Sequence, residues 1–204
     1  RQRHRLDHPA IGRHGNCLAL LFHQNHRRSK DKGDYKAMFL MGKKGRDFHI
    51  IFSFCRQTSR SVCASWLYDL YEKKKLERYP IVYKIEGLFA MDEFVSDFDV
   101  EGDYRGYHIP VIADKRAKDG KYERVEANSG HFERLRVFWN EDEKETLDQT
   151  TAIDQHLAFE KGSGANDDAP DAIQGNMADL NKATFVSSFD VHTTSRASMK
   201  TRHY

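Results

Sequence analysis

Apolar residues occur along the chain in short runs that are separated by polar connections, several of them containing glycine. Short runs rich in branched and aromatic side chains are typical of strands. Two such runs flank residues 42–45, where two glycines favour a turn between neighbouring strands. We therefore expect strands at residues 17–22, 37–41, 48–54, 81–85, 107–112 and 137–139.

Between several of these runs, apolar residues recur at helical spacing. In residues 59–75, Val62, Trp66 and Leu70 follow one another every four positions, which places them on one face of a helix. Lysines close this segment, where they suit the negative end of the helix dipole. The same reasoning predicts helices at residues 59–75, 89–101, 121–135, 143–159 and 169–180.

Three strands in a row, followed by alternating helices and strands, predict an α/β fold with a mixed sheet and helices on both faces. This order resembles that of a ribonuclease H-like domain, which we expect to span residues 17–181. Residues 1–16 are rich in Arg and His without periodicity, so we expect an irregular basic segment there. Residues 182–204 are basic and rich in Ser and Thr, which predicts a flexible tail.

The composition excludes several classes of protein. No run of about 18 apolar residues occurs, so we expect no membrane span. The three cysteines form no CxxC pair, which argues against a zinc ribbon or a disulfide framework and favours a reducing, cytoplasmic setting. The 33 basic and 31 acidic side chains leave a net charge of +2, which indicates no partner. Because the chain starts with Arg1, we expect it to be a piece of a longer protein.

Two groups of acids stand out. Glu86 follows the strand predicted at residues 81–85, and ligand sites of α/β sheets collect at such strand ends. Asp167, Asp168 and Asp171 lie within five residues, where like charges repel one another unless a cation is near. Carboxylate oxygens are ligands that Mg²⁺ prefers, so the two groups together predict a two-metal phosphodiester site.

Each group also has a plainer interpretation. Glu86 as a solvated acid at a strand end needs no ligand. Asp168 makes a good helix N-cap, and Asp171 suits the positive end of the helix that follows. Capping leaves Asp167 without an explanation.

Five basic residues gather between the strand predicted at 107–112 and the helix predicted at 121–135. They form either a solvated helix face or a track for DNA phosphates. No GxxxxGK[ST] phosphate loop occurs, so we expect no ATP binding through such a loop. No GxSxG nucleophile elbow occurs either. The five residues are Lys115, Arg116, Lys118, Lys121 and Arg124.

From about residue 33 to about residue 180, these pieces resemble the C-terminal nuclease domain of the phage terminase large subunit, the DNA-packaging motor. The resemblance rests on four segments in the same order, of which residues 159–172, ending in the paired aspartates, are the most specific. The other three segments are residues 33–37, 85–87 and 121–126.

The resemblance implies an endonuclease that cuts concatemeric double-stranded DNA with two Mg²⁺ or Mn²⁺ ions. Glu86 matches the second acidic motif of the family. Asp167 and Asp168 match the third, with Asp167 the direct ligand and Asp171 in support. Asp34 matches an acid just before the second strand, near the site and secondary.

The resemblance also implies partners. These are DNA, an ATPase domain that lies N-terminal in the full protein and is missing from this chain, the portal protein and the small terminase subunit. It places the protein in the cytoplasm of an infected bacterial host, or of a host that carries the prophage, and away from membranes.

One acid of the family pattern is missing. The family carries its first metal-binding Asp at the end of the first strand, where this chain has Gln24 or a neighbour of it. Asp7 lies too early to take this role, and Asn166 replaces a histidine often seen before the paired aspartates. Either the domain has lost a ligand and most of its activity, or the first 32 residues are a misreading of the gene in another frame. Sequencing the gene upstream of Ser29 separates the two.

Two other functions therefore stay open. The first is a catalytically defective packaging module that binds DNA or the portal. The second is another ribonuclease H-like nuclease, such as a resolvase, which would prefer branched DNA to linear duplex.

Overall fold

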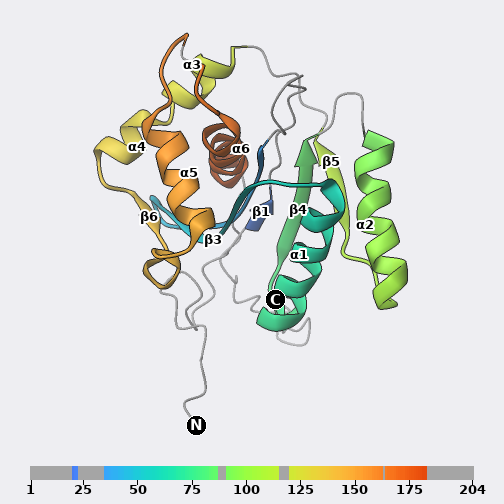
Figure 1. Cartoon of the computed structure of the whole chain (residues 1–204). Helices are drawn as coiled ribbons and strands as arrows, with labels where there is room; N and C mark the ends of the chain where they lie inside the picture. The colour runs from blue at the N-terminus through green and yellow to red at the C-terminus, as the bar shows by residue number, and fades with distance from the viewer. Residues whose placement is uncertain (1–19, 23–34, 87–90, 115–119, 163, 183–204) are drawn as a thin grey trace, which may run out of the picture.

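The structure is a computed structural model that describes residues 20–22, 35–86, 91–114, 120–162 and 164–182, and Figure 1 shows the whole chain. Two of its short helices, η2 and η3, are of the 3₁₀ type. In chain order its elements are β1 (Leu20–Phe22), β2 (Tyr35–Lys44), β3 (Asp47–Gln57), α1 (Arg60–Lys74), η2 (Leu76–Arg78), β4 (Ile81–Glu86), α2 (Met91–Arg105), β5 (Val111–Asp114), α3 (Lys121–Glu126), α4 (Ser129–Glu133), β6 (Val137–Trp139), η3 (Glu141–Glu143), α5 (Leu147–Leu157) and α6 (Asp168–Lys182).

The strands form one mixed sheet in the order β5-β4-β1-β2-β3-β6. β2 is antiparallel to both β1 and β3, whereas β1 runs parallel to β4, and β4 runs parallel to β5. Consequently β1, β4 and β5 end at one edge of the sheet, at which β2 begins. We call this the carboxyl edge, and in Figure 1 the arrowhead of β4 points towards it, at the top of the view.

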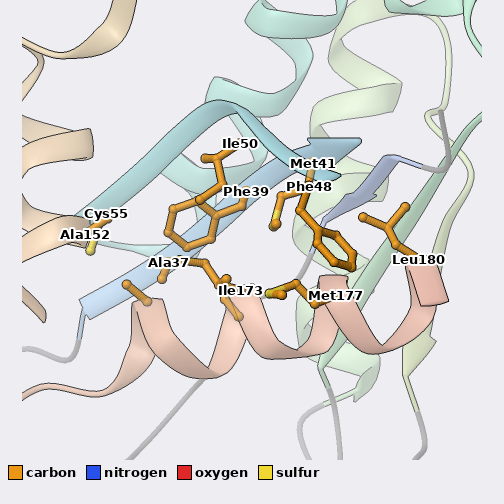
Figure 2. Packing of buried hydrophobic residues seen from close by; sticks show 12 residues of the cluster. Ala37, Phe39, Met41, Phe48, Ile50, Cys55, Ala152, Ile173, Met177 and Leu180 are labelled. Carbon is orange, nitrogen blue, oxygen red and sulfur yellow. The ribbon is translucent and has the colours of Figure 1, made fainter. Parts of the chain in front are cut away.

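Both faces of the sheet are covered by helices, as Figure 1 shows, because the central strands alternate buried side chains between two cores. Phe39 and Met41 of β2 pack with Ile173 and Met177 of α6, and Figure 2 shows this cluster between the helix and the strands. Met38, next to Phe39 in the chain, packs on the opposite face against α1 and α2. The prediction of a mixed α/β sheet with two helical layers is confirmed.

The outer edge of β3 is closed by side chains beyond its pairing with β6. The registered pairs join β6 to residues 48–50 of β3. Further along β3, the Asn140 amide donates to the Ile51 carbonyl at 2.8 Å, and the Cys55 N–H donates to the Asp148 carboxylate at 3.1 Å. Arg56 then donates to both oxygens of Asp148 at 2.7 and 2.6 Å, which fixes the start of α5 against the sheet.

Two predicted elements differ from the structure. The strand predicted at residues 107–112 begins only at Val111, because the Tyr107 N–H still donates to the Gly102 carbonyl and closes α2. Pro110 thus precedes the strand, as its missing N–H favours. The helix predicted at residues 121–135 is two short helices, α3 and α4, which are separated at Ala127 and Asn128.

The two predicted terminal segments lie outside the described residues almost entirely, so their separation from the domain stays a prediction. Among the described residues, no helix combines the length and apolar character that crossing a membrane requires.

Candidate functional site

The first acid of the candidate site ends a strand at the carboxyl edge. Glu86 is the last residue of β4, and Ile85 before it is buried in the core that faces α1 and α2. In the neighbouring parallel strand, Asp114 lies in register with Glu86. Sequence reasoning missed Asp114 because it ended the strand at Ile112, although an acid after an apolar run was the same signal that selected Glu86. The side chains of both acids lie outside the described part of the structure.

The second acidic group begins the central helix of one layer. α6 starts at Asp168, and the Asp171 N–H donates to the Asp167 carbonyl at 3.1 Å, so Asp167 rather than Asp168 occupies the N-cap position. Asp168 and Asp171 are buried, at 6% and 2% exposure. Buried carboxylates are rare in proteins unless they are paired, so these acids are more than surface caps.

The course of α6 brings this helix start to the carboxyl edge. Asn176 donates from its amide to the Phe39 carbonyl at 3.3 Å, and Lys43 donates to Asn181 at 2.7 Å, so α6 runs along β2 in the same direction. Its first residues therefore lie where β2 begins. Because only β1 separates β2 from β4, these two strands are about 10 Å apart. Asp167 and Glu86 thus belong to the same edge of the sheet, and their convergence on one ion stays a prediction.

Asp168 lies on the side of α6 that faces the sheet. The pKa of the Cys55 thiol in β3 is raised far above its usual range, first by burial and then by the negative charges of Asp168 and Asp148. Ala172, four residues after Asp168 and therefore on the same face of α6, is buried in the core cluster that contains Cys55. Asp167, whose side chain is 18% exposed, is the more accessible of the two acids.

Two basic residues of α3 cover the acids at the start of α6. The Lys121 ammonium lies 2.8 Å from Oδ1 of Asp167 and 3.7 Å from Oδ2 of Asp171. The Arg124 guanidinium lies 3.2 Å from Oδ1 of Asp171 and donates to the Gln174 amide oxygen at 2.9 Å. These two cations account for the burial of Asp171 without a metal ion.

The remaining predicted site residues lie outside the described residues. They are Asp34, Lys115, Arg116 and Lys118, together with the position of Gln24, where the family pattern requires an acid. Among the side chains that the structure describes, no three His, Cys, Asp or Glu residues form a group able to hold a metal ion. The predicted ligand Glu86 is not part of that set, so the ligand assignment stays a prediction.

Comparisons of the sequence find no relatives. No protein-family model matches the chain, and no curated protein does.

Comparison of the structure finds terminase nuclease domains. The nuclease domain of the human cytomegalovirus terminase has a TM-score of 0.58 at 11% identity, with 80% of this chain and 83% of that chain covered. A manganese-soaked, inhibitor-bound form of that domain has a TM-score of 0.59 at 12% identity, with 83% and 90% covered. The large terminase of a thermophilic bacteriophage has a TM-score of 0.51 at 13% identity, with 87% of this chain and 41% of that chain covered.

The TM-scores show a common fold, whereas identities this low leave the chemistry to be argued from the residues. The order of strands and the helices on both faces therefore place this chain in the same architecture as those domains. The resemblance to terminase nuclease domains is confirmed at the level of the fold: this chain has the ribonuclease H-like fold of those domains.

Proposed function

We propose that this chain is the nuclease domain of a DNA-packaging terminase large subunit and that it cleaves double-stranded DNA with divalent metal. One observation carries the proposal. Acids from two distant segments, Glu86 at the end of β4 and Asp167 with Asp168 at the start of α6, belong to the same edge of a ribonuclease H-like sheet. In open α/β sheets, this edge is where ligands bind.

The donor set fits Mg²⁺ or Mn²⁺. All candidate ligands are carboxylates, and hard divalent cations take oxygen ligands. Asp167 already accepts a cation in this structure, since the Lys121 ammonium lies 2.8 Å from its Oδ1. The similar cytomegalovirus domain was soaked with manganese, which agrees with a divalent ion in this fold.

Each residue of the proposed site has a separate task. Glu86 and Asp167 would hold the two ions, and Asp168 would support Asp167. Asp171 would keep Arg124, and with it α3, in place. When bound, the ions would supply positive charge for the developing phosphorane and a hydroxide for attack on phosphorus.

The DNA would approach the carboxyl edge along the segment that leads into α3. Lys115, Arg116 and Lys118 lie in that segment, between the end of β5 and Gly120. Contacts from lysine and arginine to phosphates do not read base sequence, so we expect binding that tolerates any duplex and weakens with salt.

The wider assembly belongs to the proposal as well. This chain spans 41% of the bacteriophage large terminase that it resembles. We infer that the full protein carries an ATPase domain N-terminal to this one and works with a portal protein and a small terminase subunit in an infected bacterium.

A nicking assay on supercoiled plasmid with Mn²⁺ tests the proposal. We expect cleavage by the wild-type domain and its loss in Glu86→Ala. The melting temperature should not fall, because a ligand acid opposes folding by repulsion. Glu77→Ala is the matched control, because Glu77 is exposed and precedes β4 at its opposite end. Equal cleavage by Glu86→Ala and wild type would show that the carboxyl edge is not the site.

The missing first-strand acid favours a second candidate, a packaging module that binds DNA without cutting it. The segment from Leu18 to Lys30 contains no Asp or Glu, and an amide does not supply the anion that neutralises a metal ion. Salt-sensitive DNA binding without any Mn²⁺-dependent cleavage identifies this function.

A further inference from the structure

The ion pair between Lys121 and Asp167 is unlike a surface salt bridge. Its two side chains are 20% and 18% exposed, and the ammonium lies 2.8 Å from the carboxylate oxygen. Exposed pairs contribute little because water screens them, whereas this pair is largely removed from water. The acid in it is the one proposed to bind metal.

The position of α3 does not depend on this pair. Arg124, one turn further along the helix, donates to Gln174 and pairs with the buried Asp171, both in α6. Val125 of the same helix is buried. Lys121 can therefore change its partner while α3 stays in place.

A second acceptor for the lysine lies close by. Oδ2 of Asp171 is 3.7 Å from the Lys121 ammonium, so a small rotation of the flexible side chain transfers it from one carboxylate to the other. Asp171 remains paired with Arg124 in either arrangement. The acids at the start of α6 thus provide two positions for one ammonium group.

We propose that Lys121 is a built-in counter-cation that occupies Asp167 in the absence of metal and must leave it for a divalent ion to bind. This inference rests on the proposed function, because it takes Asp167 to be a metal ligand. A metal ion about 2.1 Å from a carboxylate oxygen and an ammonium at 2.8 Å from the same oxygen would repel each other strongly. Lys121 then moves towards Asp171, and the apparent affinity for metal is lowered by the free energy of the pair that is broken.

Mn²⁺ affinity, measured from the electron paramagnetic resonance signal of the free ion, tests this competition. We expect Lys121→Met to bind Mn²⁺ about five-fold more tightly than wild type, since no competing cation remains. Lys161→Met is the matched control. It removes the same charge from the loop before α6, but Lys161 is 74% exposed and lies 4.0 Å from Glu123, which is not a proposed ligand. We expect less than a roughly two-fold change from Lys161→Met.

A measurement on the unaltered protein covers the case in which Lys121→Met fails to fold. The Nζ resonance of Lys121 in a nitrogen-15 spectrum should shift as Mg²⁺ is added, while that of Lys161 should not. An unchanged Lys121 resonance at saturating Mg²⁺ overturns the proposal. An unchanged or weaker Mn²⁺ affinity of folded Lys121→Met also overturns it and makes Lys121 a positioning residue.

The failure of this inference differs from the failure of the proposed function. If wild type binds Mn²⁺ in a manner that Glu86→Ala abolishes, but Lys121→Met binds no tighter, only the competition is wrong. If neither protein binds Mn²⁺, both ideas are wrong. If only Lys121→Met binds Mn²⁺, the competition is confirmed in its strongest form.

Discussion

The molecule contains two ion-pair clusters with the same chemistry and opposite burial. At the start of α6 the acids are inside, with the Asp171 side chain 3% exposed, and cations cover them. Between α1 and α2 the cation is inside: the Arg105 side chain is 15% exposed, and its partner Asp69 is 67% exposed. Glu72 and Glu101 complete this second cluster, 3.2 and 2.7 Å from Arg105.

This difference in burial gives the two clusters different roles. We call Arg105 with its three acids the α1–α2 brace, because it links those two helices. The buried Arg105 guanidinium joins two helices and needs no further ligand, because its acids Asp69 and Glu72 are exposed and can also be solvated by water. A buried acid that stays ionised is costly without a partner, and a cation of suitable size and charge lowers that cost. The buried acids at the start of α6 are therefore stabilised by a nearby positive charge, whereas the exposed acids of the α1–α2 brace need none.

The largest predicted effect on folding breaks the first cluster. Asp171→Ala leaves Arg124 without its acid and Lys121 with Asp167 alone, and we expect it to lower the free energy of unfolding by about 3 kcal/mol. Guanidinium denaturation measures the change. Asp69→Ala is the matched control, because Asp69 is the exposed acid of the other cluster. Equal losses for the two variants would remove the distinction between the clusters.

A somewhat smaller loss of stability is expected from replacing Gly102, which lies in α2 as Arg105 does. A Cβ added at Gly102 of α2 would lie 2.6 Å from the Tyr68 hydroxyl and 2.5 Å from Nδ1 of His108. Tyr68 is held in place, since it donates to the Phe98 carbonyl at 3.1 Å and accepts from the Ile109 N–H at 3.2 Å. We expect Gly102→Ala to cost about 2 kcal/mol in thermal unfolding. Unchanged stability would mean that α2 slides easily along α1.

Removing the brace itself should have a modest effect. Arg105→Met keeps the aliphatic packing and loses three ion pairs, two of them with the exposed acids Asp69 and Glu72, so we expect a cost of about 1 kcal/mol. The cost should shrink in about 1 M salt, where surface charges are screened over about 3 Å. A loss as large as that of Asp171→Ala, measured by the same denaturation, contradicts the comparison.

The smallest expected effect is a pH dependence of stability that comes from His156, on the face of the sheet covered by α5 and α6. Burial lowers the pKa of His156 in α5, whose ring packs on Phe132 with centroids 4.2 Å apart. The folded state therefore keeps this histidine neutral at a pH where the unfolded chain protonates it. Stability present above the ordinary pKa of 6.5 should be lost as pH falls below it, and His156→Gln should reduce this loss. Melting temperatures between about pH 7 and about pH 5.5 measure both slopes.

Short apolar runs were sufficient to predict the strands of the sheet, because buried strands such as β3 leave a direct hydrophobic signal. Boundaries were less predictable where tertiary contacts decide them. The Tyr107 N–H bonds back to α2, although the residues around Tyr107 read as a strand. Val62 shows the same limit: it matches the helical stripe of α1 but is 42% exposed, since Cys63 and Ala64 face the core instead.

The acids of the candidate site could be selected from the sequence, but their cation partners could not. Lys121 and Arg124 were predicted as contacts for DNA phosphates, because a run of basic residues indicates a solvated face or a phosphate track. The structure instead pairs both with acids of α6, and this depends on how α3 folds back after Gly120, whose φ of +59° favours glycine. Pairing between segments this far apart in the chain leaves no local pattern. Their contact with DNA stays a prediction.

The side chains that bond to the outer backbone edge of β3 affect how the domain behaves when several copies are close together. A sheet edge with unpaired backbone groups is a template on which another chain can add a strand and begin to aggregate. In β3 the Ile51 carbonyl and the Cys55 N–H are already bonded to Asn140 and Asp148. Crowding of copies would therefore leave their sheets separate at this position, because merging them here would first require both bonds to break.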